Sequence, residues 1–96
     1  KKQMEYIRRL TKLTVENCSE IDGFIERYSK GWKINRISRT ALAVQRCAIC
    51  EILYMDDVPN ASAIDEAVEL AKKFATKEDA SFINGVLGKV VKEIDA

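Results

Sequence analysis

Apolar residues recur along most of the chain at steps of three and four, which is the spacing of one face of an α-helix. The first stripe runs from Met4 to Tyr28, while charged residues such as Arg8 and Glu20 fall largely off it. We therefore expect a helical segment over this range, with inward positions at Ile7, Leu10, Thr14, Cys18, Ile21, Ile25 and Tyr28.

A second helical segment follows an interruption. Residues 29–37 break the pattern, and Gly31 suits the left-handed cap that ends many helices. Ser38 suits the N-cap of the next helix. From Ala41 to Met55 the sequence is apolar nearly all round, and a helix without a polar face is normally enclosed by others. This segment is therefore predicted to be the central helix, interrupted only by Gln45, Arg46 and Glu51.

Two further helices are predicted after a turn at 56–60. Asn60 or Ser62 is expected to cap the third helix, and Thr76 with Asp79 resembles a capping box that opens the last. The last helix should end at about Ile94. Strand-like alternation is absent from the sequence, so we expect an all-α bundle of four to five helices. Inward positions are Ile64, Ala67, Val68, Ala71, Phe74 and Ala75, then Ile83, Val86, Leu87, Val90 and Ile94.

Composition narrows the class of protein. The 96 residues are 47% apolar and 32% charged, which is typical of one globular domain. The sequence has no apolar run near the roughly 18 residues of a membrane helix and no visible secretory leader. Three cysteines without an export signal indicate reduced thiols. We therefore expect a cytoplasmic protein that does not span a membrane.

The chemically reactive residues do not form a recognisable catalytic or metal site. The chain lacks histidine, which excludes His-based acid–base catalysis and Cys₂His₂ zinc sites. Cys47 and Cys50 form a C-x-x-C inside an apolar run with no second ligand pair, so we interpret them as core residues. We expect no enzyme, no metal and no cofactor, because solvated positions also explain the carboxylate pairs Asp56-Asp57, Asp65-Glu66 and Glu78-Asp79.

Positive charge gathers in one part of the chain, with a net charge of +5 over residues 1–40 and −4 over residues 41–96. Such asymmetry hints at an end that faces a polyanion. Residues 30–39 place four cations around Trp32, whose ring could stack a base but is more simply explained by burial. Phe82, beside Lys77 and Ser81, could stack an unpaired base or pack against the preceding loop.

Three strings of the sequence are diagnostic when they occur together. Asp57-Val58-Pro59 is followed by AIDEAVELAK at 63–72 and by FINGVL at 82–87, and residues 36–54 complete the pattern upstream. In this order they resemble the NusB family, whose central helix is similar to residues 36–54. The resemblance covers residues 5–94.

The resemblance implies an all-helical transcription antitermination factor. Such a factor binds boxA-type single-stranded RNA as a heterodimer with the ribosomal small-subunit protein NusE, and joins the RNA polymerase elongation complex. It implies RNA contacts at Lys77, Glu78, Ser81 and Phe82. We expect NusE to dock on the central helix and the turn after it, at Ala41, Gln45, Arg46, Asp56, Asp57, Val58 and Pro59.

The sequence also departs from the family. The family's domain begins with a basic arm and a helical pair without a counterpart here, so we expect residues 1–96 to be one NusB-like domain truncated at its N-terminus. Cys47 and Cys50 stand where larger apolar or aromatic residues are usual in the family, and Gln45 stands where leucine would be. An uncovered apolar stripe would favour self-association. Two other functions remain open: an RNA-recognition module of a ribosomal RNA cytosine methyltransferase, and a protein-interaction module without an RNA role.

Overall fold

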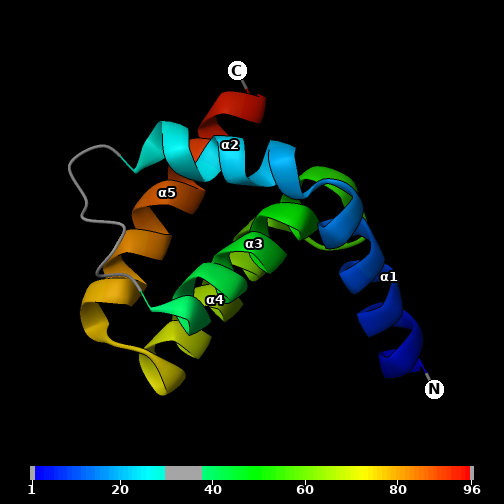
Figure 1. Ribbon diagram of the computed structural model, residues 1–96, viewed down its shortest axis with the longest axis horizontal. Coiled ribbons are helices and arrows are strands. Elements are labelled where there is room, and N and C mark those ends of the chain that lie inside the picture. Colours follow the sequence, from blue (N-terminus) through cyan, green and yellow to red (C-terminus); the bar gives the residue numbers. More distant parts are fainter. Residues whose placement is uncertain (1, 30–37, 96) are drawn as a thin grey trace.

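The computed structural model describes residues 2–29 and 38–95, and they form five α-helices (Figure 1). These are α1 (Lys2–Glu16), α2 (Cys18–Tyr28), α3 (Arg39–Tyr54), α4 (Asn60–Phe74) and α5 (Lys77–Asp95). Within the described ranges no residue belongs to a β-strand, and the predicted all-α class is confirmed.

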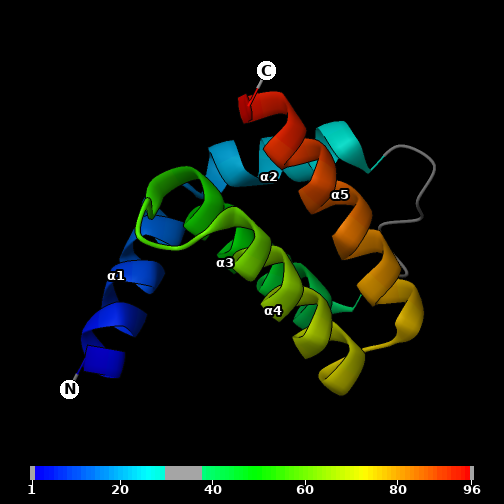
Figure 2. The same ribbon diagram turned by 180° about the vertical axis from the view of Figure 1, so that it is seen from behind.

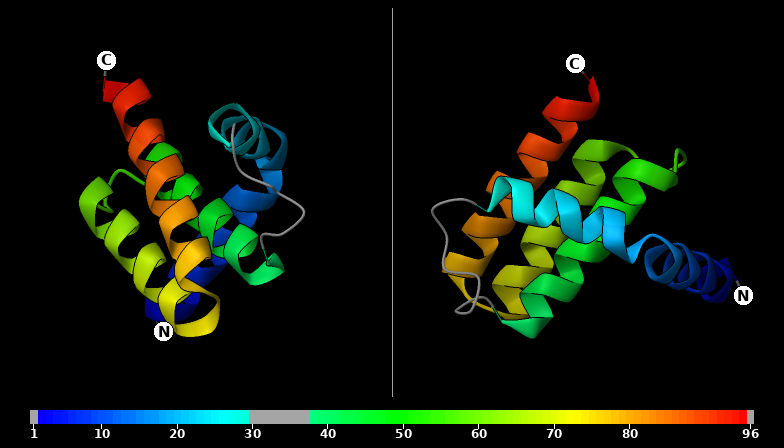
Figure 3. Two further views of the ribbon diagram at one scale, coloured as in Figure 1. Left: turned by 90° about the vertical axis from the view of Figure 1, so that its left-hand side faces the viewer. Right: turned by 45° about the horizontal axis from the view of Figure 1, so that its top comes forward.

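The first helical segment is broken at Asn17, so the prediction of one continuous stripe from Met4 to Tyr28 is wrong at that point. Both the backbone N–H and the side-chain amide of Asn17 donate to the Leu13 carbonyl, at 3.1 and 2.9 Å. An asparagine that bonds its local backbone competes with continuation of the helix. The chain changes direction there, so α1 descends at one side of the molecule while α2 crosses the bundle (Figures 1 and 3).

The predicted central helix is α3, which contacts each of the other four helices. It packs with α4 and α5 to form the body of the bundle, and Figure 2 shows α4 and α5 on the side where they lie next to each other. Two residues of α2, Ile21 and Ile25, close this core. The largest completely buried apolar side chains are Ile21, Ile49, Phe82, Ile83, Val86, Leu87 and Val90.

Hydrogen bonds at the helix starts confirm the predicted cap at Ser38 and the Thr76 half of the predicted capping box. The Ser38 hydroxyl accepts from the Ala41 N–H at 3.0 Å, and the Thr76 hydroxyl accepts from the Asp79 N–H at 3.0 Å. Ser38 also donates to the buried carboxylate of Asp79 at 3.0 Å. The two helices are therefore joined at their first turns.

The predicted cap of α4 is wrong. Neither Asn60 nor Ser62 is its N-cap; Pro59 occupies that position, with extended backbone (φ −61°, ψ 139°) and no side-chain hydrogen bond. The Pro59 carbonyl accepts the first helical bond, from the Ala63 N–H. Proline fixes φ at a value compatible with this entry, so the helix begins directly after it. Gly31, predicted to end the first segment, lies outside the described residues.

Some positions predicted to face inward are exposed. The exposed fractions of Ile7 and Phe74 are 53% and 65%, and Ile94 and Cys18 are also exposed. Met4 and Val15 of α1 are exposed as well. Periodicity gives the direction of an apolar face but not how much of it another helix covers. Among the helices of the described ranges, none combines the length and apolar character of a membrane span.

Candidate nucleic-acid interface and partner surface

Three of the predicted RNA-contacting residues lie exposed at the start of α5: Lys77, Glu78 and Ser81. The first turn also carries Asp79, which is buried against Ser38 and therefore contributes to the fold rather than to the surface. Acidic residues suit the positive end of the helix dipole, but they reduce its attraction for an anion. Attraction of phosphate to this turn therefore depends on Lys77.

Phe82 does not lie on this surface. Its side chain is completely buried in the apolar core, together with Ile83 and Val86. The hypothesis that its ring is exposed to stack a base is thus not supported, and the packed alternative describes this structure. The physical reason is the width of the buried face, because α5 packs against α2, α3 and α4 and so covers both positions 82 and 83.

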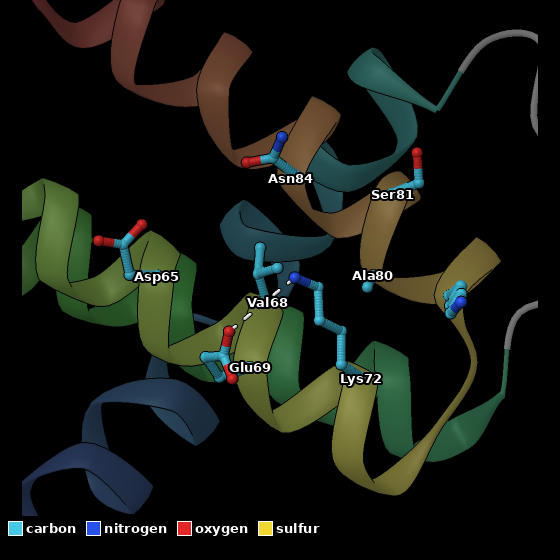
Figure 4. Close-up of a pocket in the computed structure, with 8 residues that line it drawn as sticks. Asp65, Val68, Glu69, Lys72, Ala80, Ser81 and Asn84 are labelled. Carbon is cyan, nitrogen blue, oxygen red and sulfur yellow. Dashed lines mark ion pairs between the residues drawn. The ribbon is translucent and has the colours of Figure 1, made fainter.

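Lys77 and Ser81 line a groove between α4 and α5, with a volume of about 790 Å³ (Figure 4). Its floor contains Val68 and Ala80, and side chains of α4 form the opposite wall. The sequence did not predict that this wall forms a site. The one indication in the sequence was that its polar residues recur at helical spacing on the polar face of the 60–74 helix. The remaining lining residues are Asp65, Glu69, Lys72 and Asn84.

An ion pair lies within the groove. The Lys72 ammonium reaches from α4 toward α5, and lies 3.9 Å from the Glu69 carboxylate (Figure 4). Both side chains are largely exposed, at 57% and 76%. A long, exposed pair of this kind contributes little to stability. Lys72 can therefore exchange Glu69 for an anionic ligand.

The predicted partner surface is divided by the structure. Ala41 and Gln45 are completely buried, so these two residues cannot form a docking surface, and their inclusion was wrong. They face inward because α3 is enclosed by the other helices. Arg46 is partly exposed and pairs with the Asp22 carboxylate at 2.8 and 3.3 Å.

The turn between α3 and α4 provides the exposed part of that prediction. Asp56, Asp57 and Pro59 are exposed and Val58 is half-buried. The Arg9 guanidinium of α1 donates to both carboxylate oxygens of Asp57, at 2.7 and 2.9 Å. These bonds hold the pKa of Asp57 below its ordinary value. The turn is thus positioned by α1.

The two cysteines of the C-x-x-C motif, Cys47 and Cys50, lie within α3 and pack as part of the protein interior. Cys50 is buried, Cys47 is half-buried, and burial raises the pKa of both thiols above the ordinary value. Raised pKa values favour the protonated thiol, which is the less reactive form. This position supports the interpretation of the pair as core residues.

A second hollow of about 280 Å³ lies between α1, α3 and α4, lined mainly by apolar side chains. At its edge the Tyr6 hydroxyl donates a hydrogen bond to the Glu51 carboxylate. Burial raises the pKa of Glu51, and the bond from Tyr6 opposes that rise. Tyr6 therefore stabilises a partly buried negative charge.

Comparison with known proteins shows which family the sequence resembles. The model of the NusB family matches residues 1–92. Over 88 residues the chain is 56% identical to the transcription antitermination protein NusB of Acetivibrio thermocellus, covering 92% of this chain and 61% of that protein. It is 44% and 45% identical, over 91 residues, to proteins of the same name from Natranaerobius thermophilus and Alkaliphilus oremlandii. Each alignment covers 95% of this chain and 66% of the relative, so the chain spans less than two thirds of these curated relatives.

Proposed function

The chain belongs to the NusB family, and from this membership we propose that it acts in transcription antitermination. In this proposal it binds boxA-type single-stranded RNA as a heterodimer with the ribosomal small-subunit protein NusE. The heterodimer then joins the RNA polymerase elongation complex in the cytoplasm. The role is one of binding and assembly rather than catalysis.

The observation that supports RNA binding best is the placement of Lys77 and Ser81. Both are exposed at the start of α5 and both line the α4–α5 groove, where Lys72 supplies a second cation from the opposite helix. Phosphates are held mainly by lysine and arginine, while hydroxyl and amide groups add hydrogen bonds. Glu78 belongs to the same surface but cannot attract phosphate, so we assign it to hydrogen bonding with ribose or base.

Phe82 has a different role in this proposal. Because its ring is buried, it holds the first turns of α5 against the core and so positions Lys77 and Ser81. Direct stacking on RNA would require the ring to leave the core, which costs several kcal/mol for a buried phenylalanine. Substitution of Phe82 is therefore expected to reduce stability and RNA binding together.

For NusE, the surface that fits is the turn between α3 and α4. Asp56 gives it a negative charge, since Asp57 is paired with Arg9, and Val58 with Pro59 adds apolar surface. Such a combination favours a partner that presents basic and apolar residues. Asp56→Lys is expected to weaken the heterodimer without unfolding it, and Asp95→Lys on the exposed end of α5 is the matched control.

The experiment for RNA binding is a gel shift of labelled boxA RNA with the chain and NusE, compared with an unrelated RNA over a series of salt concentrations. Each phosphate contact to a single strand contributes a slope of about −0.7 in log affinity against log salt concentration. Lys77→Gln should reduce the slope by about this amount, whereas Lys89→Gln, exposed elsewhere on α5, should not. An equal shift with unrelated RNA would refute the proposal. Partner binding without any RNA contribution would instead indicate a pure protein-interaction module.

A further inference from the structure

The groove between α4 and α5 differs chemically at its two ends. The two helices are antiparallel and joined by Ala75 and Thr76 alone, so Lys72 and Lys77 lie near the connection. Asp65 and Asn84 lie at the opposite end of the groove. Lys77 therefore stands at the connection, the Lys72 ammonium extends along the groove to the Glu69 carboxylate, and the far end carries a carboxylate and an amide.

The separation of the two ends suits a nucleotide. Seven residues separate Asp65 from Lys72, and seven separate Lys77 from Asn84, which corresponds to about 10 Å along each helix axis. This length is comparable to the span of a nucleotide from its phosphate to the far edge of its base. It is also close to the Debye length of about 8–10 Å in moderate salt, so Asp65 repels a phosphate at the lysine end only weakly.

The groups between the two ends suit the body of a nucleotide. Val68 and Ala80 provide an apolar floor against which a base can lie, and the exposed Ser81 hydroxyl can bond a ribose or phosphate oxygen. The ion pair between Lys72 and Glu69 is long and exposed, so the Lys72 ammonium can form a hydrogen bond to a phosphate instead. Small-molecule sites commonly combine an apolar floor with a few polar groups in this way.

The far end selects among the bases. A carboxylate has two acceptor oxygens and no donor, so it pairs best with a base that presents two adjacent N–H donors. On the Watson–Crick edge, guanine alone does so, through N1–H and the N2 amino group. The Asn84 amide can donate to the neighbouring guanine O6, since an amide has both donors and an acceptor.

We propose that this groove binds a guanine nucleotide unit of single-stranded RNA, with the phosphate between Lys72 and Lys77 and the base edge at Asp65 and Asn84. The inference rests on the proposed RNA-binding function and adds to it a base preference. It extends the RNA surface from the start of α5 onto α4.

The test uses two short, unstructured oligoribonucleotides that differ only at one position, guanosine in one and inosine in the other. Inosine lacks the N2 amino group and so removes one of the two donors to Asp65. Fluorescence anisotropy with the chain and NusE together should show at least about fivefold tighter binding of the guanosine oligonucleotide, the lower limit for a bidentate base contact. Asp65→Asn should abolish this preference while the inosine oligonucleotide binds as well as before or better, because a negative charge is removed.

The control is Asp95→Asn, which removes the same charge from an exposed position at the end of α5 and should leave the preference unchanged. If both oligonucleotides bind equally to the unaltered chain, or if Asp65→Asn retains the preference, the guanine inference is overturned while RNA binding stands. If neither oligonucleotide binds, the proposed function itself fails. Free guanosine monophosphate should compete only weakly, and competition as strong as that of the oligonucleotide would overturn the assignment to RNA.

Discussion

Replacing Gln45 by leucine should stabilise the protein. Gln45 is completely buried on α3, one turn from the buried residues Ala41 and Ile49. Among the residues that the structure describes, neither its amide nitrogen nor its amide oxygen has a hydrogen-bond partner. Both atoms therefore lose water on folding, and no group within residues 2–29 and 38–95 gives them a replacement bond.

The size of the effect follows from this lost solvation. A buried polar group left without a partner costs about 1–3 kcal/mol. Leucine has a similar size and no polar atoms, so Gln45→Leu should raise the free energy of unfolding by about 1–3 kcal/mol. For a domain of this length each kcal/mol corresponds to roughly 4–8 °C in Tm, so the rise should be at least about 4 °C.

Thermal and urea unfolding followed by circular dichroism provide the assay, with the urea slope unchanged if the folded state is the same. Gln3→Leu on exposed α1 is the matched control and should have little effect on Tm. Gln45→Ala should gain less than Gln45→Leu, because it leaves a cavity. A lower Tm for Gln45→Leu would refute the reasoning and show that the amide is hydrogen-bonded in solution.

Three further predictions follow from the geometry of α5, of α1 against α3, and of the thiols. Gly88→Ala should increase stability by about 0.5–1 kcal/mol, because Gly88 is within α5 and a Cβ atom there meets no atom within 4 Å. Tyr6→Phe should raise the pKa of Glu51 further, as seen by NMR titration. Because burial already raises this pKa, the stability that Glu51 contributes is greatest below about pH 4 and decreases as the pH rises through the pKa of Glu51 in the folded protein. The loss in free energy of unfolding caused by Tyr6→Phe should therefore be small in acid and larger near pH 7. Cys18, which is exposed, should react with iodoacetamide well before Cys47 and Cys50, as read by mass spectrometry.

Each of these predictions has an internal control. Ala43→Gly, at an exposed position inside α3, should lose roughly what Gly88→Ala gains, and destabilisation by Gly88→Ala would mean that the space beside it is occupied. An equal deficit of Tyr6→Phe at both pH values would exclude the bond to ionised Glu51. In urea all three thiols should react alike, and fast labelling of Cys47 in the folded protein would contradict its place in the core.

The spacing of apolar residues predicted the helices well where a single apolar face of the helix packs against the core of the bundle. The central position of α3 and the cap at Ser38 followed from apolar character and local chemistry, which are properties of neighbouring residues. The break at Asn17 was not predicted, because an asparagine can bond its own backbone or point into solvent without changing the apolar pattern.

The site was harder to predict than the fold. Burial of Phe82 depends on how many helices pack around α5, and this number cannot be read from the stripe of α5 alone. Ala41 and Gln45 were placed on a surface for the same reason. The groove was not predicted because its walls come from two helices. Which residues of α4 face which residues of α5 is set by tertiary packing.

The hydroxyl of Ser38 joins the starts of two helices whose bonded residues are 41 positions apart in sequence. When the first turn of α3 opens, the Ser38 hydroxyl leaves both the Ala41 N–H and the Asp79 carboxylate, so a buried charge on α5 loses its bond at the same moment. Local opening of one helix start should therefore be coupled to the other as one cooperative unit. Amide hydrogen exchange at Ala41 and Asp79 would then report a shared opening free energy. The rigidity of the turn that presents Lys77 would depend on the hydrogen bonds of a serine that lies more than a third of the chain away in sequence.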